Sequence, residues 1–462
     1  MRDTVLFFVL FIVCQDGDSF YNSYCHLISI VILYQEHYKK REKTIMKITP
    51  VKGTNDYLPR EAALRDYLKK TILDIYTENG FEHIYTPAIE DAENLDKSDG
   101  GENLSLIFNI LKRGDKLDKV IAEGLTQSNV KDLYDLGLRY DLTLPLSRYF
   151  ANNRNNLILP VKCIQIDRVY RAERPQKGRL REFIQCDIDI IGSDSHTAEV
   201  ELILTTAKAL NAIGLKDFRV RLNDMRLLHA VLLDTGFEKN DLESVCITFD
   251  KMDKVGIEGV CTELEEKGLS ANVIAAFKDL ISGGELTLDY IKSKLTDKTP
   301  AEDLERVMAD VAELSGGSVK TEFDLSLVRG QGYYTGTVFE VVSDKFSGSV
   351  AGGGRYDKLI GKFLNEDIPA VGFSIGFERI FAILTEGGIK LPGGKKKVAV
   401  LYNEDSFRDA VKKADELRSE GNIACLYERP KKTGKFIDNL EKYGFDGFVI
   451  VGESDEVKMF ES

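Results

Sequence analysis

Two stretches of alternating apolar and polar residues flank a short basic segment, and together they predict an antiparallel hairpin. In VKCIQIDRVYR (161–171) and FIQCDIDIIG (183–192), alternate residues are apolar, and the second stretch is the more regular. The apolar face is expected to pack on a core. The opposite face carries a row of polar side chains, namely Gln165, Asp167, Arg171, Gln185, Asp187 and Asp189.

The segment between the two predicted strands, RAERPQKGRLR from Arg171 to Arg181, is a local cluster of cations. Five of its eleven residues are arginine or lysine, whereas the whole chain has a formal net charge of -13. The overall field would repel an anion, so long-range steering cannot account for the cluster. One guanidinium group can bind two phosphate oxygens at once, and it stays charged at any working pH. A short concave site for a polyphosphate therefore accounts for the cluster.

A solvated outer face of a sheet is the simpler interpretation of the polar row. Solvated strand faces tend to use Thr, Lys and Glu, whereas this row uses Gln, Asp and Arg. That composition favours a shaped pocket, but the spacing alone leaves both interpretations open.

Taken together, these residues resemble a known family. The Arg-x-Glu strand end, the basic loop and the REF-x-Q strand are similar to motif 2 of class II aminoacyl-tRNA synthetases, and ERPQKGR is similar to its histidyl-tRNA synthetase form. Four further segments resemble that family in its order, across about residues 46 to 460: KGTNDYLP (Lys52–Pro59), LRYDLTLPLSRY (Leu138–Tyr149), LVRGQGYYTGTVFE (Leu327–Glu340) and VGFSIGFERI (Val371–Ile380).

The resemblance implies an α+β fold, in which an antiparallel sheet of the class II type is flanked by helices. A helical insertion and a C-terminal α/β domain like the family's anticodon-binding domain are expected to accompany it. The expected divisions are a catalytic domain in two parts (46–224 and 321–385), a helical insertion (225–320), a linker (386–394) and the C-terminal domain (395–462). Residues 92–137 are expected to form a helical or looping insertion, and the family's motif 1, a helix over Glu61–Asn79 with the strand HIYTPAIE, to form a homodimer interface.

The resemblance also assigns the site. Arg171 is expected to hold the α-phosphate of ATP and the substrate carboxylate, Glu173 the adenine end, and Arg379 the γ-phosphate. Arg329 would act on the α-phosphate, although Gln331-Gly332 departs from the Leu-Asp that many members have beside it. The residues implied for histidine are Asp141, Thr143, Gln185, Asp189, Arg329, Tyr333, Tyr334 and Tyr356.

These assignments describe an enzyme that joins histidine to tRNA(His) with ATP and Mg²⁺. Activation of a carboxylate by ATP depends on positioning and cationic clamping. The sequence contains no HExxH motif and no GxxxxGK[ST] loop, and its five histidines are not clustered. Basic residues of the C-terminal domain could contact tRNA phosphates or form a solvated face: Lys395–Lys397, Lys412, Lys413, Arg429, Lys431, Lys432 and Lys435.

Three alternatives share parts of this pattern. A regulatory paralogue that controls ATP phosphoribosyltransferase would tend to lose the arginine motif and the C-terminal domain, most of which this chain keeps. A nucleic-acid sensor without catalysis would be fused to a kinase, and no kinase signature occurs. Prolyl, threonyl and glycyl enzymes share the scaffold but should lack RG-x-x-YYTG.

The first 45 residues do not fit the pattern of the rest of the chain. VLFFVLFIVC is too short to span a bilayer, Asp3 offsets Arg2, and the segment lacks a tidy cleavage site. We interpret residues 1–45 as a mis-assigned extension before Met46, with a membrane anchor as the alternative. Seven cysteines without a C-x-x-C pair indicate reduced core thiols, so a cytoplasmic protein without a membrane association is expected.

Overall fold

The computed structural model describes residues 47–97, 105–124, 126, 129–176, 178–329, 333–386, 395–454 and 456–460. Contacts divide the chain into two units, Met1–Val51 and Lys52–Ser462, and every element described below belongs to the second. Our interpretations of residues 1–45 and of Gln331-Gly332, and most of the linker expected at 386–394, lie outside the described residues.

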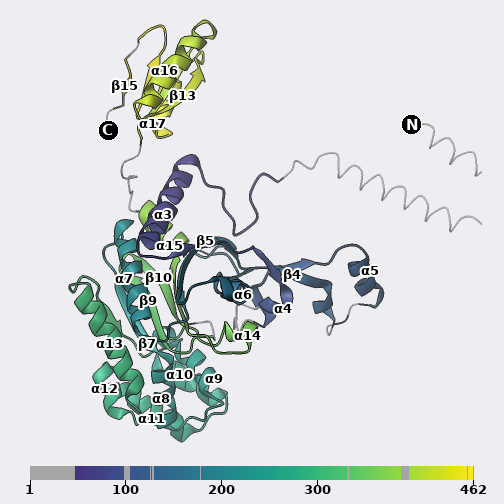
Figure 1. Ribbon diagram of the computed structural model, residues 1–462, viewed down its shortest axis with the longest axis vertical. Helices are drawn as coiled ribbons and strands as arrows, with labels where there is room; N and C mark the ends of the chain where they lie inside the picture. The colour runs from purple at the N-terminus through teal and green to yellow at the C-terminus, as the bar shows by residue number, and fades with distance from the viewer. Residues whose placement is uncertain are drawn as a thin grey trace, which may run out of the picture. The chain divides into compact units, whose positions relative to one another are not determined.

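An eight-stranded sheet forms the centre of the larger unit (Figure 1). Its neighbouring strands are antiparallel, except that β1 and β8 at the two edges run parallel to their neighbours. The strands, in the order in which they pair, are β1 (Glu82–His83), β5 (Val161–Tyr170), β6 (Glu182–Ile191), β11 (Ala370–Gly376), β10 (Phe346–Arg355), β9 (Thr337–Ser343), β7 (Arg219–Asp224) and β8 (Thr321–Phe323).

The predicted hairpin is confirmed as β5 paired with β6, in a register that places Gln165 opposite Asp187. Strand β6 lies inside the sheet between β5 and β11, and its polar row is covered: Asp187 and Asp189 are 5% and 3% exposed. A solvated outer face is therefore the wrong interpretation of the row on β6. These carboxyl groups line a cavity.

Helices cover the other face of the sheet and form the main core with it. The buried residues Leu68, Ile72 and Tyr76 of α3 pack in one cluster with Cys186 and Ile188 of β6. The expected helix over Glu61–Asn79 is confirmed, with Pro at its start and a positive-φ Gly80 just past its end. The helices that share this core include α3 (Pro59–Glu78), α7 (Thr197–Ala212) and α15 (Phe377–Glu386).

The segment HIYTPAIE, expected as one strand, is divided between two sheets. Glu82–His83 joins the large sheet as β1, whereas β2 (Ile89–Asp91) joins a small sheet beyond Pro87. Proline has no N–H group and fixes φ, so a ladder does not continue through it easily. The small sheet has the order β2-β4-β3, with β3 (Asn109–Leu111) and β4 (Tyr134–Leu138).

Residues 92–137 were expected to be helical or looping, and that description was incomplete. They contain β3 and most of β4, together with the short helices α4 (Ala92–Asp96) and α5 (Asp115–Ala122). Strands of three and five residues are too short to give a recognisable alternation in a polar segment.

Helices fill the chain between β7 and β8, and they lie together beside the β7–β8 end of the large sheet (Figure 1). The helical pattern predicted for this stretch is therefore confirmed. The helices are α8 (Met225–Thr235), α9 (Leu242–Phe249), α10 (Met252–Glu266), α11 (Ala271–Ser282), α12 (Leu288–Lys294) and α13 (Thr299–Leu314).

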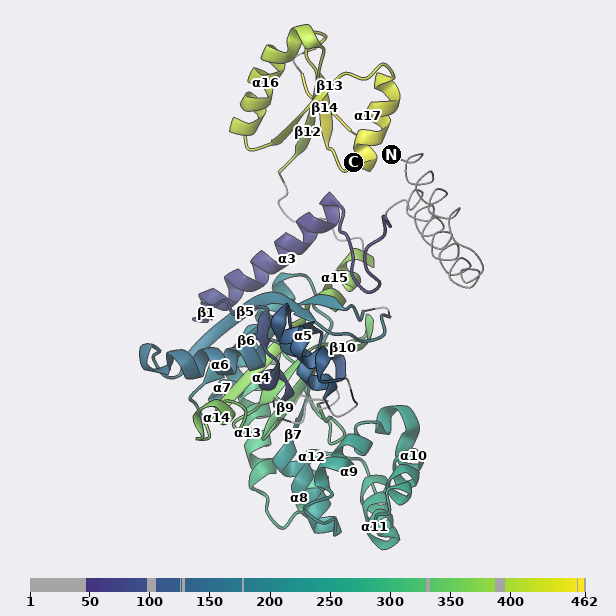
Figure 2. The same cartoon turned by 90° about the vertical axis from the view of Figure 1, so that its right-hand side faces the viewer.

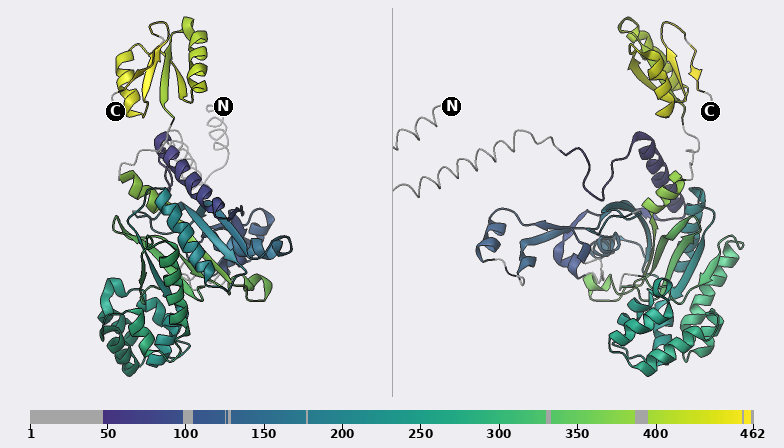
Figure 3. Two further views of the ribbon diagram at one scale, coloured as in Figure 1. Left: turned by 60° about the vertical axis from the view of Figure 1, so that its left-hand side comes forward. Right: turned by 180° about the vertical axis from the view of Figure 1, so that it is seen from behind.

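The C-terminal elements form an α/β sheet of their own, as the alternation of strands and helices predicted. Its strand order is β13-β12-β14-β15, and the helices α16 and α17 cover opposite faces (Figures 2 and 3). The short last strand, which pairs antiparallel with β14, was not predicted. The elements are β12 (Lys397–Tyr402), α16 (Phe407–Ser419), β13 (Ile423–Glu428), α17 (Thr433–Lys442), β14 (Gly447–Ile450) and β15 (Lys458–Met459).

The five cysteines within the described residues are free thiols, and four of them are buried. Of the helices formed by the described residues, none is long and apolar enough to cross a membrane.

Candidate active site

One cavity of about 450 Å³ lies over the polar face of β6. It is lined by every residue that the sequence singled out for ATP or histidine: Asp141, Thr143, Arg171, Glu173, Gln185, Asp189, Arg329, Tyr333, Tyr334, Tyr356 and Arg379. These residues come from segments up to 238 positions apart, since the first is Asp141 and the last is Arg379. The fold therefore brings the predicted set together, while the role of each residue remains a prediction.

Glycines on the neighbouring strands give the polar row of β6 its space. Gly372 of β11 pairs with Asp189, and Gly352 of β10 lies one strand further on. A Cβ atom on Gly372 would lie 2.0 Å from Asp189 Oδ1, and one on Gly352 would lie 2.2 Å from Nη1 of Arg329. Both distances are far inside van der Waals contact. We call these two glycines the glycine floor. Because they have no Cβ atom, the Asp189 carboxyl group and the Arg329 guanidinium group can lie against the sheet.

Three arginines reach the cavity from three separate elements. Arg171 follows β5 directly, and its Nε donates to the carbonyl of Tyr140 at 3.0 Å. Arg329 pairs with Glu340 of β9 at 3.2 Å. Arg379, in the first turn of α15, donates to the hydroxyl of Ser349 at 3.1 Å. Each of these contacts uses one nitrogen of the guanidinium group, which has more donors to offer a ligand.

The guanidinium end of the cavity also contains the ring of Phe183 and a fourth arginine, Arg179. Arg171 lies 5.2 Å from the centre of the Phe183 ring. Arg179 of the basic loop lies 3.6 Å from Glu173, which this contact holds at the cavity wall. Burial lowers the pKa of Arg379, and the nearby Arg179 and Arg329 lower it further. Like charges this close destabilise each other, and a bound polyanion would relieve that repulsion.

Carboxyl groups gather in the same cavity. Burial raises the pKa of Asp141 to about 6. Burial also raises the pKa of Asp189 to about 7, although the hydrogen bond from Tyr356 acts in the opposite direction. The pKa of Asp187 lies well above its usual range because of burial and of the neighbouring Asp189. A bound cation would stabilise the ionised forms of all three groups.

Three tyrosines line the same cavity as Asp189, and one of them contacts it. The hydroxyl of Tyr356 donates to Asp189 Oδ1 at 2.6 Å, and both side chains are buried. The ring of Tyr333 lies 4.9 Å from that of Tyr334 and 6.0 Å from that of Tyr356, measured between centres. This part of the cavity combines flat apolar walls with one fixed acceptor, so it suits a small aromatic group that carries an N–H.

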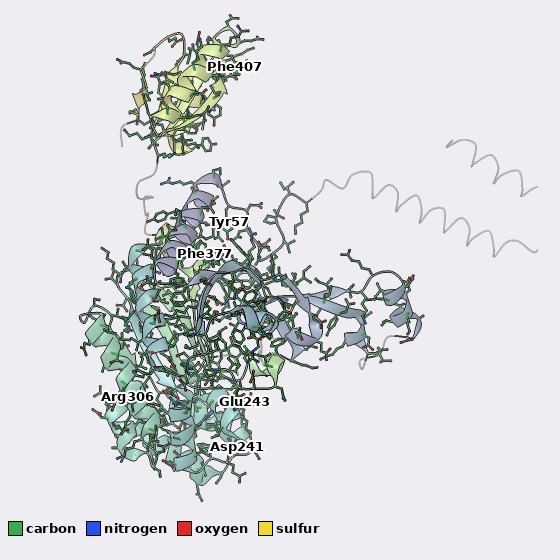
Figure 4. All side chains as sticks on the ribbon, in the orientation of Figure 1. Tyr57, Asp241, Glu243, Arg306, Phe377 and Phe407 are labelled. Atoms are coloured by element: carbon green, nitrogen blue, oxygen red, sulfur yellow. The ribbon has the colours of Figure 1, made fainter. Side chains whose placement is uncertain are left out.

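A buried ion pair that the sequence analysis missed supports the first turn of α15. Glu378 receives two hydrogen bonds from Arg65 of α3, at 2.6 and 2.7 Å, and accepts the backbone N–H of Ile184 at 3.3 Å. Tyr57 and Phe377, which lie near each other in Figure 4, have ring centres 3.9 and 4.8 Å from the Arg65 guanidinium carbon. This contact ties α3, β6 and α15 together directly beside Arg379.

Further residues in the cavity or in contact with its lining were not assigned from the sequence. Asp187 stood in the polar row but received no role, although its place between Gln185 and Asp189 was a sufficient signal. Arg179 lay in the basic loop and Glu340 ended a matched motif, and the glycine floor could have been found from the GGG run and from Gly372. The Arg65–Glu378 pair carries no local signal, because it joins residues 313 positions apart.

A resident metal ion finds no ready site in the described part of the chain. No group of three or more His, Cys, Asp or Glu side chains there could hold one.

Comparison with known proteins places these observations in a family. A sequence model described as Histidyl-tRNA synthetase matches residues 128–380. The chain is 42% identical over 421 residues to the histidine–tRNA ligase of Leifsonia xyli subsp. xyli, which covers 87% of this chain and 95% of that protein. It is 35% identical to the histidine–tRNA ligase of Christiangramia forsetii, with 87% and 92% covered. Among solved structures, the histidyl-tRNA synthetase of Nostoc sp. PCC 7120 matches with a TM-score of 0.71 and 26% identity, covering 88% of this chain and 92% of that one.

Proposed function

The chain belongs to the histidyl-tRNA synthetase family and is a histidine–tRNA ligase, and we propose that it activates histidine in the cavity that Arg171, Arg329 and Arg379 line. The observation that carries this proposal is the convergence of the three guanidinium groups on one cavity. A triphosphate needs several cations around it, and arginine provides them at any working pH.

The reaction has two steps. In the first, an oxygen of the histidine carboxylate attacks the α-phosphorus of ATP, the bond to the bridging oxygen of pyrophosphate breaks, and histidyl-adenylate forms. In the second, a hydroxyl group at the 3′ end of tRNA(His) attacks the activated carbonyl carbon, and AMP leaves. Neither step needs a side-chain nucleophile, so the protein contributes positioning and charge stabilisation.

The three arginines bind different negatively charged groups of ATP and histidine. Arg171 binds the α-phosphate and the histidine carboxylate, which brings the two reacting groups together. Arg329 stabilises the α-phosphate from the opposite side of the cavity, and Arg379 binds the γ-phosphate. Glu173 orients the adenine end. The free guanidinium nitrogens and the mutual repulsion of Arg329 and Arg379 support these roles.

Histidine lies along the polar row of β6 with its ring toward Asp189 and Tyr356. Asp189 accepts a hydrogen bond from one ring nitrogen, and the rings of Tyr333 and Tyr334 enclose the imidazole. Asp141, Thr143 and Gln185 bind the amino-acid end. A site with fixed acceptors rejects an amino acid of similar size without matching donors, since its buried groups would stay unpaired.

Mg²⁺ enters with ATP, where it would neutralise phosphate charge. The described residues fit this better than a resident metal, because Mg²⁺ keeps several waters and is usually bound through phosphates and one or two carboxylates. Glu173 and Glu340, which contact Arg179 and Arg329, are the carboxylates that we expect to contact it.

The remaining roles follow from the family. The protein acts in the cytoplasm as a homodimer joined through the motif 1 segments α3, β1 and β2. Its C-terminal domain contacts tRNA(His) through basic residues just before α17 and in its first turn, which are Lys431, Lys432 and Lys435. Lys412, Lys413 and Arg429 are less suited, because each is already paired with a nearby carboxylate.

Two assays test the proposal. Exchange of labelled pyrophosphate into ATP should depend on histidine, and tRNA(His) should become charged in the presence of histidine, ATP and Mg²⁺. Exchange that responds to another amino acid and not to histidine would reassign the site. Absence of exchange with every amino acid would favour a regulatory protein.

A further inference from the structure

Strand β6 contributes three polar side chains to the cavity, and the middle one has no role in the proposed function. Asp187 lies between Gln185 and Asp189 on the same face, opposite Ser374 of β11. It is 5% exposed and lines the cavity. No ion pair joins it to an arginine, lysine or histidine anywhere in the described ranges of the chain. A buried carboxylate of this kind is costly unless a ligand compensates it.

Three buried oxygen atoms of this cavity have no hydrogen-bond partner among the residues that the structure describes. They are Oδ2 of Asp141, Oε1 of Gln185 and Oδ1 of Asp187. Buried polar atoms are nearly always paired, so a group of three in one cavity calls for an explanation. All three are acceptors, and two belong to carboxyl groups.

Hydrogen bonds within the protein hold two of these acceptors in place. Oδ1 of Asp141 accepts the backbone N–H of Leu144 at 3.1 Å, which leaves Oδ2 for another donor. The amide nitrogen of Gln185 donates to the hydroxyl of Ser374 at 3.2 Å, which fixes the amide orientation that leaves Oε1 free. The acceptors are therefore oriented before any ligand arrives.

The order of the polar side chains along β6 indicates which group of the substrate each of them binds. Gln185 pairs with Gly376, next to the helix start that carries Arg379, and Asp189 pairs with Gly372 beside Tyr356. Asp187 lies midway along a row that spans about 13 Å at the usual strand rise. An amino acid whose carboxylate faces Arg171 and whose ring reaches Asp189 has its α-ammonium group between them. An ammonium group has three N–H donors and one positive charge.

We propose that Asp187 binds the α-ammonium group of histidine, and that it supplies the third acceptor beside Asp141 and Gln185. This inference rests on the proposed histidine site and adds to it a substrate-binding residue. Two carboxylates and one amide oxygen match the three N–H bonds of the ammonium group, and they stabilise its charge where water is excluded. Asp187 thereby selects an α-amino acid over an acid that lacks the amino group.

Three ligands that differ in one group test the inference on the full-length protein. L-Histidine carries the ammonium and the carboxylate, L-histidinol keeps the ammonium but replaces the carboxylate with CH₂OH, and 3-(imidazol-4-yl)propionate lacks the ammonium. Binding of each to wild type and to Asp187→Asn is measured by calorimetry. A charge-assisted hydrogen bond accounts for roughly ten- to hundredfold in affinity. We expect Asp187→Asn to lower the affinity for histidine and for histidinol by that factor. The affinity for the propionate should stay within about twofold of the wild-type value.

Control variants separate a binding role from a structural one. Asp344→Asn removes an exposed negative charge of the β9–β10 turn and should leave all three affinities unchanged. Asp189→Asn should weaken all three ligands, because it affects the ring. Asp187→Asn should not lower the thermal midpoint of the free protein, since burial already disfavours the ionised form of Asp187 and asparagine is a neutral side chain of the same shape; a structural role would lower the midpoint. Should Asp187→Asn fail to fold, Asp187→Ser replaces it in the same measurements.

Three results would overturn the inference. The first is an equal loss for histidine and for the propionate, and the second is unchanged histidine affinity in a folded variant. The third is a raised KM for ATP with normal histidine binding, which would assign Asp187 to the nucleotide. Failure of the proposed function is recognised separately, because wild-type protein would then show no histidine-dependent exchange.

Discussion

The hydroxyl of Tyr356 donates a hydrogen bond to Oδ1 of Asp189 at 2.6 Å, although 167 positions separate the two residues. Both side chains are buried, Asp189 on the sheet floor and Tyr356 just past the end of β10. The tyrosine fixes the direction of the carboxyl group. It thereby leaves Oδ2 of Asp189 as the acceptor that we assign to the imidazole.

Removing the hydroxyl group of Tyr356 should weaken the binding of histidine more than the binding of ATP. Tyr356→Phe keeps the ring against Tyr333 but leaves Asp189 Oδ1 without its donor. The cost of an unpaired buried group is about 1–3 kcal/mol, so we expect the KM for histidine in pyrophosphate exchange to rise about ten- to hundredfold. The KM for ATP should change by less than about threefold. Tyr443→Phe, at an exposed tyrosine, is the control, and a larger effect on ATP would move Tyr356 out of the histidine site.

The stability of the free protein should report the raised pKa of Asp189. Its ordinary value is 3.8 and its folded value is about 7, so between these pH values the folded state binds more protons than the unfolded state. The contribution of Asp189 to stability is therefore present below pH 3.8 and is lost as the pH rises to about 7. The side chain of Asn does not titrate, so the free energy of unfolding of the Asp189→Asn variant should rise relative to that of wild type over that range. The expected difference reaches about 4 kcal/mol. Urea unfolding at pH 4 to 8 measures this difference, and a difference independent of pH contradicts the assignment.

The sequence predicted the parts of the fold that depend on local periodicity. Alternation marked β5 and β6, and helical spacing with a glycine stop marked α3. Side chains at alternate positions of a strand must share a face, so the spacing of Gln185 and Asp189 was enough to predict that both line one pocket. The arginines could be joined to that pocket only through the family resemblance, because no local pattern relates Arg171 to Arg379.

Other features could not be predicted because they depend on contacts between distant segments. The burial of the polar row of β6 follows from its central place in the sheet, which the hairpin alone does not determine. Pro87 lies between two segments of two and three residues, and such short strands are set by their partners. Glu378 has an ordinary place in a helix start, and its function as the partner of Arg65 requires the fold.

Arg329→Ala should abolish histidine-dependent exchange while the fold stays intact. Its guanidinium group is partly exposed to the cavity and contacts Glu340, so its loss removes a cation from the phosphate site and leaves no buried core defect. Loss of one such donor costs about 10²- to 10³-fold in kcat. Circular dichroism and the thermal midpoint check the fold, and Arg306→Ala, on the surface of α13, provides a matched control. Exchange at the wild-type rate in a folded Arg329→Ala protein would remove Arg329 from the mechanism.

Gly352→Ala tests the same guanidinium group without removing it. The new Cβ atom would lie 2.2 Å from Nη1 of Arg329, the mobile end of a long side chain. The side chain should move aside at little cost to stability, and kcat should fall at least about tenfold because the charge is misplaced. Gly434→Ala on α17, where no atom of the described chain lies within 4 Å of the added Cβ, should leave kcat unchanged. Wild-type kcat in Gly352→Ala would mean that the position of Arg329 does not matter.

The buried pair of Arg65 and Glu378 should couple the stability of the protein to its affinity for ATP. Arg65→Met leaves Glu378 as an unpaired buried charge, which costs about 3–5 kcal/mol. The KM for ATP should rise as well, because Arg379 follows Glu378 directly in the first turn of α15. The double variant Arg65→Met/Glu378→Gln should recover part of the lost stability, since glutamine is neutral and still accepts the N–H of Ile184.

Lys70→Met, which breaks an exposed pair on the same helix, should change neither the stability nor the KM for ATP. Urea unfolding and exchange at varied ATP concentration measure both effects. A double variant no more stable than Arg65→Met would show that the cost lies in lost packing of the arginine side chain, because neutralising the abandoned carboxylate would then bring no gain.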